Sequence, residues 1–261
     1  MQAQGLKKVY FFFSSLVIFI LHLPFVFAKN KPVEVKPLPL RIETTAPVDS
    51  IFNLTKIKIQ TTALSLYDSL RLNLMGLSKQ AFEYAMQGFD YLVQNNRLDN
   101  DRVISIVDFS QPSFKKRLFV IDLDKAKVIF NTYVAHGVNT GKADATQFSN
   151  RPESNKSSLG FYETRSTYNG GKGYSLRLEG LESGINDNAG RRDIVMHGAA
   201  YVSEGLIQSQ GYIGRSWGCP ALPEKLSKPI IDKIKNGTCL FIYGPDKNYI
   251  SHSRILHPAG S

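Results

Sequence analysis

The stretch DIVMHGAAYVSEGLIQSQGYIGRSWGCPALP, residues 193–223, joins a short apolar run that ends in histidine to a turn that carries a cysteine. The β-branched run at its start predicts a strand with His197 near the end, where the ring can leave the sheet and face a cleft. Cys219 lies between Gly218 and Pro220, in a turn-like setting that is unusual for a cysteine kept only for packing. The stretch therefore predicts a cysteine nucleophile with a histidine base.

A thiol nucleophile needs a base for its proton and donors for the oxyanion that forms on attack. His197 is the candidate base. Gly218 allows a sharp turn, so that the backbone N–H groups of Gly218 and Cys219 can point at a carbonyl oxygen. Ser216 and Trp217 complete the turn before the thiol. The expected catalytic residues are therefore Cys219, His197, Gly218 and Ser216.

Two other interpretations stay open on the residues alone. A secreted chain with two cysteines permits a disulfide between Cys219 and Cys239, although the strand-like GTCLFIYG suits Cys239 as a small buried hydrophobe. His197 also fits a core histidine that is bonded to a backbone carbonyl.

A metal site is a third possibility, with His136 of VAHGVNTG, His197 and Cys219 as ligands. No two of these residues have the close spacing that is typical of zinc ligands. We therefore expect no metal and no cofactor. His252 and His257 belong to a polar tail and are expected to have no role.

The N-terminus predicts export. Lys7 and Lys8 precede the apolar run VYFFFSSLVIFILHLPFVFA, which contains Pro24 and ends at Ala28. This pattern is typical of a secretory signal peptide over residues 1–28, with an uncleaved membrane anchor as the alternative. We expect cleavage, no stable membrane insertion afterwards, and a location outside the cytoplasm for the rest of the chain.

The mature chain is expected to be basic. Loss of two lysines with the signal peptide lowers the net charge from +10 to +8. The sequence contains no Lys/Arg run with interleaved aromatic residues, so nucleic acid is a poor candidate partner. An anionic extracellular partner such as cell wall or lipid head groups fits the charge, as does an ordinary basic surface.

The mature chain divides into four predicted segments. Residues 29–61 are rich in Pro and charge and predict an extended linker. Residues 62–100 predict a helical pair packed on the main domain, and residues 101–246 predict a mainly β catalytic domain with a few helices. Residues 247–261 form the polar tail.

Within these segments, Ser78 is the expected N-cap of the second helix, and the apolar positions Leu77, Ala81, Ala85, Phe89 and Leu92 recur at helical spacing. The Gly-, Ser- and Asn-rich stretch 138–164 is expected to be a long loop with a wrapping or functional role.

HGAAYVSEGLIQSQGYIGRSWGCPALP resembles the active-site signature of the L,D-transpeptidases of bacterial cell walls, in which His-Gly precedes a Ser-x-Gly-Cys turn. VDFSQPSFKKRLFVIDL, VAHGVNTG, FSNRPESNKSSLGFYET, GYSLRLEGLESGINDNAGRR and MHGAAYVS extend the resemblance to the murein L,D-transpeptidase catalytic domain family over about residues 78–244. The resemblance implies a β-sandwich or barrel domain in which Cys219 is the nucleophile and His197 its base.

The same resemblance implies peptidoglycan stem peptides as partners and a periplasmic or cell-wall location in a bacterium. It also implies a thioester on Cys219, cross-link formation and acylation by carbapenems. The chain departs from the widest form of the signature at Trp217, where a histidine is common, and at Pro220–Ala221, where an asparagine follows. Trp217 fits either a stacking wall for substrate or a core contact. Arg215, beside the signature, is the expected carboxylate contact, and His136 is either a substrate-site residue or a structural one.

The thioester permits three reactions: transpeptidation, L,D-carboxypeptidase action with water, and attachment of a protein amine to peptidoglycan. A non-catalytic cell-wall-binding module is the alternative of another class. The sequence contains no feature that indicates the oligomeric state.

Overall fold

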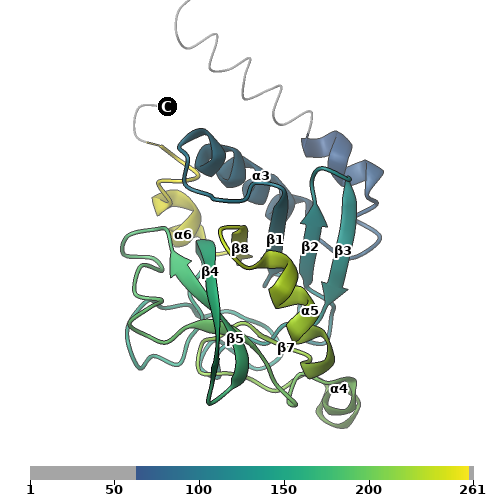
Figure 1. Cartoon of the computed structure of the whole chain (residues 1–261). Coiled ribbons are helices and arrows are strands. Elements are labelled where there is room, and N and C mark those ends of the chain that lie inside the picture. Colours follow the sequence, from purple (N-terminus) through teal and green to yellow (C-terminus); the bar gives the residue numbers. More distant parts are fainter. Residues whose placement is uncertain (1–62, 259–261) are drawn as a thin grey trace, which may run out of the picture. The chain divides into compact units, whose positions relative to one another are not determined.

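One eight-stranded sheet organises the part of the chain that the computed structural model describes, residues 63–258 (Figure 1). The expected signal peptide and linker lie outside the described residues. Within residues 63–258 no helix is long and apolar enough to cross a membrane. The strands are β1 Val103–Asp108, β2 Leu118–Asp122, β3 Lys127–Thr132, β4 Gly160–Gly170, β5 Gly173–Gly180, β6 Val195–Gly198, β7 Ala221–Leu222 and β8 Cys239–Tyr243.

The sheet curls until it is nearly closed. Its strand order is β3-β2-β1-β8-β4-β5-β6-β7, so β3 and β7 are the two edges. The chain that leaves β3 returns to β7, because Ala135 pairs with Ala221 and its N–H donates to the Ala221 carbonyl at 2.8 Å. This Ala135–Ala221 junction is the seam of the barrel, and it leaves no open sheet edge at that point. The structure therefore confirms the predicted mainly β, barrel-like fold with a few helices.

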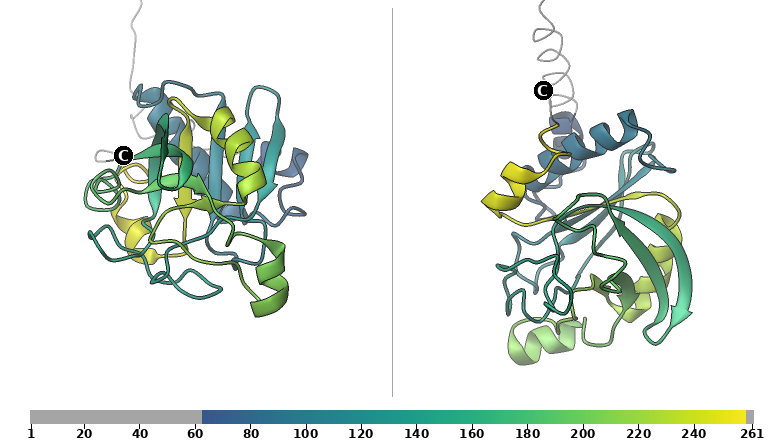
Figure 2. Two further views of the ribbon diagram at one scale, coloured as in Figure 1. Left: turned by 60° about the horizontal axis from the view of Figure 1, so that its bottom comes forward. Right: turned by 90° about the vertical axis from the view of Figure 1, so that its left-hand side faces the viewer.

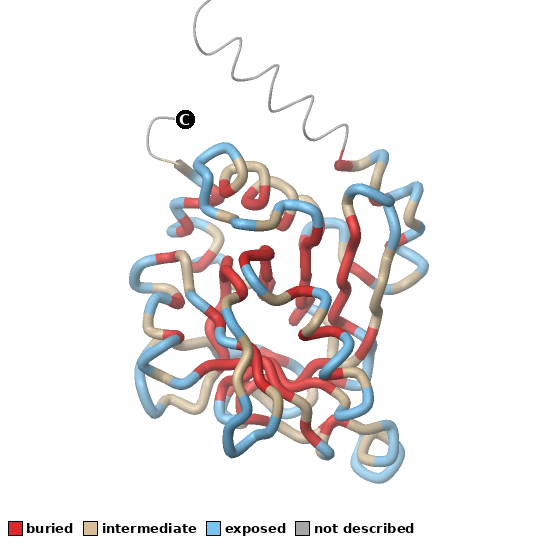
Figure 3. The backbone as a smooth tube through the Cα atoms, viewed as in Figure 1, coloured by how far each residue is buried: buried red, intermediate tan, exposed pale blue. Residues whose placement is uncertain are grey.

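The helices that are complete within the described residues are α3 Lys79–Gln94, α4 Glu204–Gln210, α5 Glu224–Ile234 and α6 Lys247–His252. Strands β1, β2 and β8 are buried at every position, and both α3 and α5 contact β1 (Figure 3). Strands that are covered on both faces have continuous apolar runs rather than alternating ones. This explains why VISIVD, LFVID and CLFIY are recognisable as strands.

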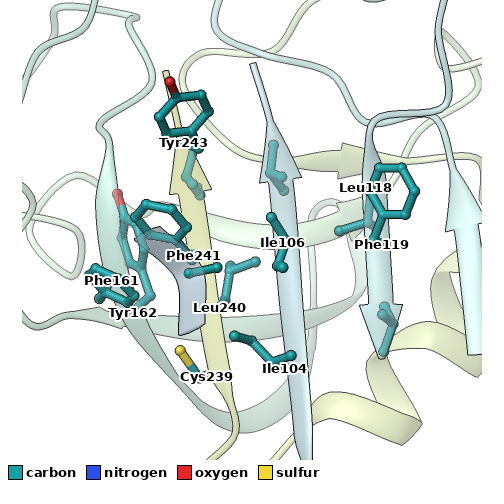
Figure 4. Packing of buried hydrophobic residues seen from close by; sticks show 14 of the residues in the cluster. Ile104, Ile106, Leu118, Phe119, Phe161, Tyr162, Cys239, Leu240, Phe241 and Tyr243 are labelled. Atoms are coloured by element: carbon teal, nitrogen blue, oxygen red, sulfur yellow. The ribbon is translucent and has the colours of Figure 1, made fainter. Parts of the chain in front are cut away.

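The helices and the sheet share one large core cluster, and a second, smaller cluster lies around Ala135, Ala199, Val202, Ile213 and Ala221. Figure 4 shows side chains of β1, β2, β4 and β8 packed together, with Cys239 among them. Helix α3 begins as predicted, since Ser78 Oγ accepts the Ala81 N–H at 3.2 Å. The apolar positions expected on its buried face, Leu77, Ala81, Ala85, Phe89 and Leu92, are all buried.

Some elements differ from the sequence-based expectation. The first predicted helix is helical over residues 63–69 and then turns, with Arg71 at a φ of +53°. Strand β4 begins inside the stretch expected to be a loop and is the longest strand. The tail expected to be polar contains α6, and Tyr249 is buried because its hydroxyl donates to the buried carboxylate of Glu182 at 3.1 Å.

Candidate active site

The turn before Cys219 is closed by a serine hydroxyl. Ser216 Oγ donates to the Cys219 carbonyl at 2.6 Å and accepts the Gly218 N–H at 3.1 Å. Gly218 has a φ of +119°, a conformation that side chains rarely adopt. A Cβ at this position would lie 2.8 Å from the Lys156 carbonyl oxygen and 2.9 Å from Ile194 Cδ1. The Ser216–Gly218 pair therefore fixes the position of the thiol through backbone geometry.

The long segment between β3 and β4 wraps this turn. The Ser216 N–H donates to the His136 carbonyl at 2.9 Å, and Gly137 pairs with Ser216. Ser157 Oγ donates to the Gly218 carbonyl at 3.1 Å. The wrapping role predicted for this Gly- and Ser-rich segment is thus visible as a set of bonds onto the thiol turn.

Arg192 ties the far end of the wrapping segment to the same turn. Its guanidinium donates to the Ser149 carbonyl at 2.9 Å and to the Lys156 carbonyl. The Lys156 oxygen is the atom that a side chain at position 218 would meet. Arg192 therefore braces the backbone beneath the thiol.

The Cys219 thiol is 2% exposed and has three polar contacts. Its S–H donates to the Asp193 carbonyl at 3.6 Å, and Sγ accepts from the Val195 N–H and from Lys172 Nζ, each at 3.5 Å. Both cysteines are free, so the disulfide alternative is wrong. Cys239 lies in the core of β8, where burial strongly raises the pKa of its thiol.

His197 lies on β6 and is present in one defined tautomer. Nδ1 is 2.8 Å from the Gly198 carbonyl oxygen, which can only accept, so Nδ1 carries the proton and Nε2 has a free lone pair. Nε2 is buried and has no hydrogen-bond partner among the described residues. Burial is the main reason that the pKa of His197 is lowered. The Gly198 bond opposes that shift, and the charge of Lys172 adds to it.

The sheet register brings His197 and Cys219 to neighbouring strands. His197 of β6 pairs with Ala221 of the parallel strand β7. Two residues earlier in each segment, Val195 of β6 lies beside Cys219, which precedes β7, as the contact of the Val195 N–H with Sγ shows. Nε2 and Sγ are not hydrogen bonded to each other, and the register places the two residues diagonally on adjacent segments. Catalytic hydrogen bonds often tighten only when substrate binds.

His136 is completely buried beneath this site. Arg117 Nη2 donates to His136 Nδ1 at 2.8 Å, and His136 Nε2 therefore carries the proton that is shared with the Gly141 carbonyl at 3.3 Å. Burial, followed by the charge of Arg117, lowers the pKa of His136 to about 3. His136 is thus neutral, and its backbone carbonyl holds Ser216 in place.

The other predicted contacts lie on the rim. Arg215 Nη1 donates to the Val138 and Gly141 carbonyls, each at 3.1 Å, so the side chain braces the wrapping segment. Trp217 is 74% exposed, which excludes a core role and leaves its ring available to a ligand.

Two residues near the thiol were missed from the sequence. Lys172 comes from the β4–β5 turn, where the run GGKG gave only a turn signal. Tyr201 also lies near Cys219. Burial, followed by the electrostatic influence of Cys219, raises the pKa of the Tyr201 hydroxyl to about 12. No group of three His, Cys, Asp or Glu side chains within residues 63–258 is placed to hold a metal ion.

Comparison with solved structures gives distant likenesses. An L,D-transpeptidase from Mycobacterium smegmatis has 13% identity and a TM-score of 0.34, over 55% of this chain and 59% of that one. An L,D-transpeptidase from Mycobacterium tuberculosis has 15% identity and a TM-score of 0.33, over 55% and 58%. The helical cell shape determining protein from Campylobacter jejuni has 15% identity and a TM-score of 0.39, over 63% and 57%.

The chain thus spans less than two thirds of the length of these proteins. No curated protein matches the sequence. The family model of the L,D-transpeptidase catalytic domain, in contrast, matches residues 74–243, which cover more than half of the chain and include all eight strands as well as Cys219 and His197. The chain belongs to the L,D-transpeptidase catalytic domain family.

Proposed function

We propose that this protein is a peptidoglycan L,D-transpeptidase that cross-links stem peptides through a thioester on Cys219. The observation that carries the proposal is the tautomer of His197. The Gly198 carbonyl fixes the Nδ1–H, so Nε2 of the neutral ring keeps a free lone pair. Within residues 63–258 this Nε2 has no hydrogen-bond partner, and His197 pairs with β7 just after the thiol turn. A buried acceptor without a donor is costly, and a thiol or amine proton would satisfy it.

The first half-reaction acylates the enzyme. Sγ attacks the carbonyl carbon of a diamino residue that precedes a terminal D-alanine, while the S–H proton moves to His197 Nε2. The carbon–nitrogen bond then breaks as Nε2 returns that proton to the departing amine. D-Alanine leaves, and a carbon–sulfur bond joins the donor peptide to Cys219.

The second half-reaction transfers the acyl group. The side-chain amine of a second stem peptide attacks the thioester carbon and gives a proton to His197 Nε2. The carbon–sulfur bond breaks, the proton returns to Sγ, and a new amide joins the two stems. Water in place of the amine gives carboxypeptidase action, and a protein amine gives anchoring to peptidoglycan.

The oxyanion donors are expected to be unequal. The Gly218 N–H already donates to Ser216 Oγ. We therefore assign the Cys219 N–H as the backbone donor for the oxyanion, with Ser216 as the residue that holds the turn in shape. Peptidoglycan as substrate also requires export, for which residues 1–28 remain the prediction.

Defined muropeptides test the reaction. Purified protein is incubated with a tetrapeptide donor and an acceptor stem, and the products are analysed by mass spectrometry. We expect a cross-linked dimer with loss of D-alanine, and intact mass after carbapenem treatment should show one adduct on Cys219. Tripeptide without dimer would instead identify a carboxypeptidase. If neither a peptide product nor an adduct formed, the result would contradict the proposed enzyme and favour a wall-binding module.

We expect the enzyme to keep its activity at mildly acidic pH. His197 must be neutral to accept the thiol proton, and its pKa is lowered chiefly by burial. A lowered pKa means that protonation, and the loss of the base, occurs below the ordinary value of 6.5. We expect kcat/KM to stay flat as the pH falls through 6.5 and to decline only further down. A profile that already declines above pH 6.5 would contradict His197 as the base.

A further inference from the structure

Lys172 is the one cationic side chain among residues 63–258 that contacts the candidate nucleophile. Its Nζ lies 3.5 Å from Cys219 Sγ. It is supplied by the turn of the β4–β5 hairpin, which forms a long curved pair of strands (Figure 2). The turn is rich in glycine, and Gly173 has a φ of +74°. The hairpin thus projects an ammonium group over the thiol.

The charge of Lys172 has no carboxylate partner. Among the described residues no aspartate or glutamate forms an ion pair with it, and its Nζ contacts Cys219 Sγ. Arg192 and Arg215 also form no ion pair within residues 63–258, but their guanidinium groups already donate to backbone carbonyls. Lys172 is also exposed whereas the thiol is 2% exposed, so an approaching ligand meets the ammonium first.

We propose that Lys172 binds the C-terminal carboxylate of the donor peptide and so selects donors that end in a free carboxylate. This inference rests on the proposed function. In a peptide the terminal carboxylate carbon is three bonds of about 1.3–1.5 Å from the preceding carbonyl carbon. When that carbonyl lies against Sγ, the carboxylate is within reach of an ammonium that is itself in contact with Sγ. Lysine binds such an anion as a point charge.

The position of Lys172 also suits the order of events. Before reaction the ammonium lies against the sulfur, and the thioester that forms there carries no charge. A carboxylate that stays next to Nζ during acylation leaves with the released residue, which frees the site for the acceptor. Arg215, expected from the sequence to contact a carboxylate, donates from Nη1 to two backbone carbonyls of the wrapping segment.

Alkylation of Cys219 tests the anion site without turnover. The rates of modification by iodoacetate and by neutral iodoacetamide are measured at Cys219 by peptide mass spectrometry, which separates it from buried Cys239. We expect Lys172→Met to lower the ratio of iodoacetate rate to iodoacetamide rate by at least about fivefold, since a charge pair at this distance contributes on this scale even in water. Lys172→Arg should retain most of the ratio, and Lys127→Met, on the exposed start of β3, should leave it unchanged.

Donor peptides complete the test. With a tetrapeptide donor, Lys172→Met should raise KM more than it lowers kcat, and the preference for a free carboxylate over a C-terminal amide should disappear. An unchanged reagent ratio, or an equal fall with both reagents, would overturn the anion site and assign Lys172 to the thiol alone. A shifted ratio in a protein that makes no peptide product would keep the anion site and refute the proposed function instead.

Discussion

Cys219→Ala will lower the rate of cross-link formation by at least about 10³-fold, because no other residue can take over the covalent step. The alanine variant should also give no carbapenem adduct. Cys219→Ser should be similarly inactive, since an alcohol is far harder to deprotonate than a thiol. Within residues 63–258 the partner of His197 is the Gly198 carbonyl, and no carboxylate is bonded to the ring that would raise its basicity. Single-turnover assays with a defined tetrapeptide would measure both losses.

Cys239 offers the matched control. It is completely buried in β8, and Cys239→Ala removes one sulfur from the core without touching the site. We expect this variant to be less stable by about 1 kcal/mol and to keep its activity per folded molecule. Activity in Cys219→Ala above a tenth of the wild-type value, with a folded protein shown by circular dichroism, would remove Cys219 from the mechanism.

The parts of this molecule that the sequence predicts well are those with local signals. A Gly-Cys-Pro turn and a strand that carries a histidine are both present as expected, and they mark Cys219 and His197 as the candidate nucleophile and base. Strands β1, β2 and β8 are equally clear, since burial on both faces requires continuous apolar runs. Ser78 is found as an N-cap because capping depends on one side chain and a nearby N–H.

The parts that escape prediction depend on pairing between distant segments. Lys172 meets Cys219 only after the β4–β5 hairpin has curved over the thiol turn. No local pattern distinguishes it from any other lysine in a glycine-rich turn. The surroundings of His136 show the same limit, because its ring is hydrogen bonded to Arg117, which comes 19 residues earlier, just before β2. The sequence therefore points to a candidate nucleophile and base, and the fold supplies their surroundings.

Arg117 is the residue on which the closed sheet and the site both depend. It is completely buried, and its Nε and Nη2 donate to the Val134 carbonyl at 3.1 and 2.9 Å. Nη1 donates to the Gln111 carbonyl at 2.8 Å, and Nη2 also contacts His136. Val134 and His136 flank the residue that pairs with β7, so these bonds fix the seam of the barrel beside the thiol turn.

We expect Arg117→Met to lower the free energy of unfolding by about 3–5 kcal/mol, because it leaves the buried Val134 carbonyl, the partly buried Gln111 carbonyl and a buried imidazole without this donor. In the same variant the rate at which iodoacetamide modifies Cys219 should also change. The reason is that the His136 carbonyl, which accepts the Ser216 N–H, is no longer held in a fixed position. Urea titrations and iodoacetamide rates would measure the two effects.

Arg102→Met is the matched control, because Arg102 is exposed and its ion pair with Asp124 spans 3.6 Å. A surface pair of this kind contributes about 0–1 kcal/mol, so the control should stay close to the wild type in both measurements. Arg117→Lys should fall between the two, since lysine keeps the charge but lacks the planar fork that serves several acceptors at once. If Arg117→Met were as stable as Arg102→Met, the seam of the barrel would not depend on this guanidinium, and the alignment of the thiol turn would have to come from the Ser216–Gly218 pair and the Ser157 bond alone.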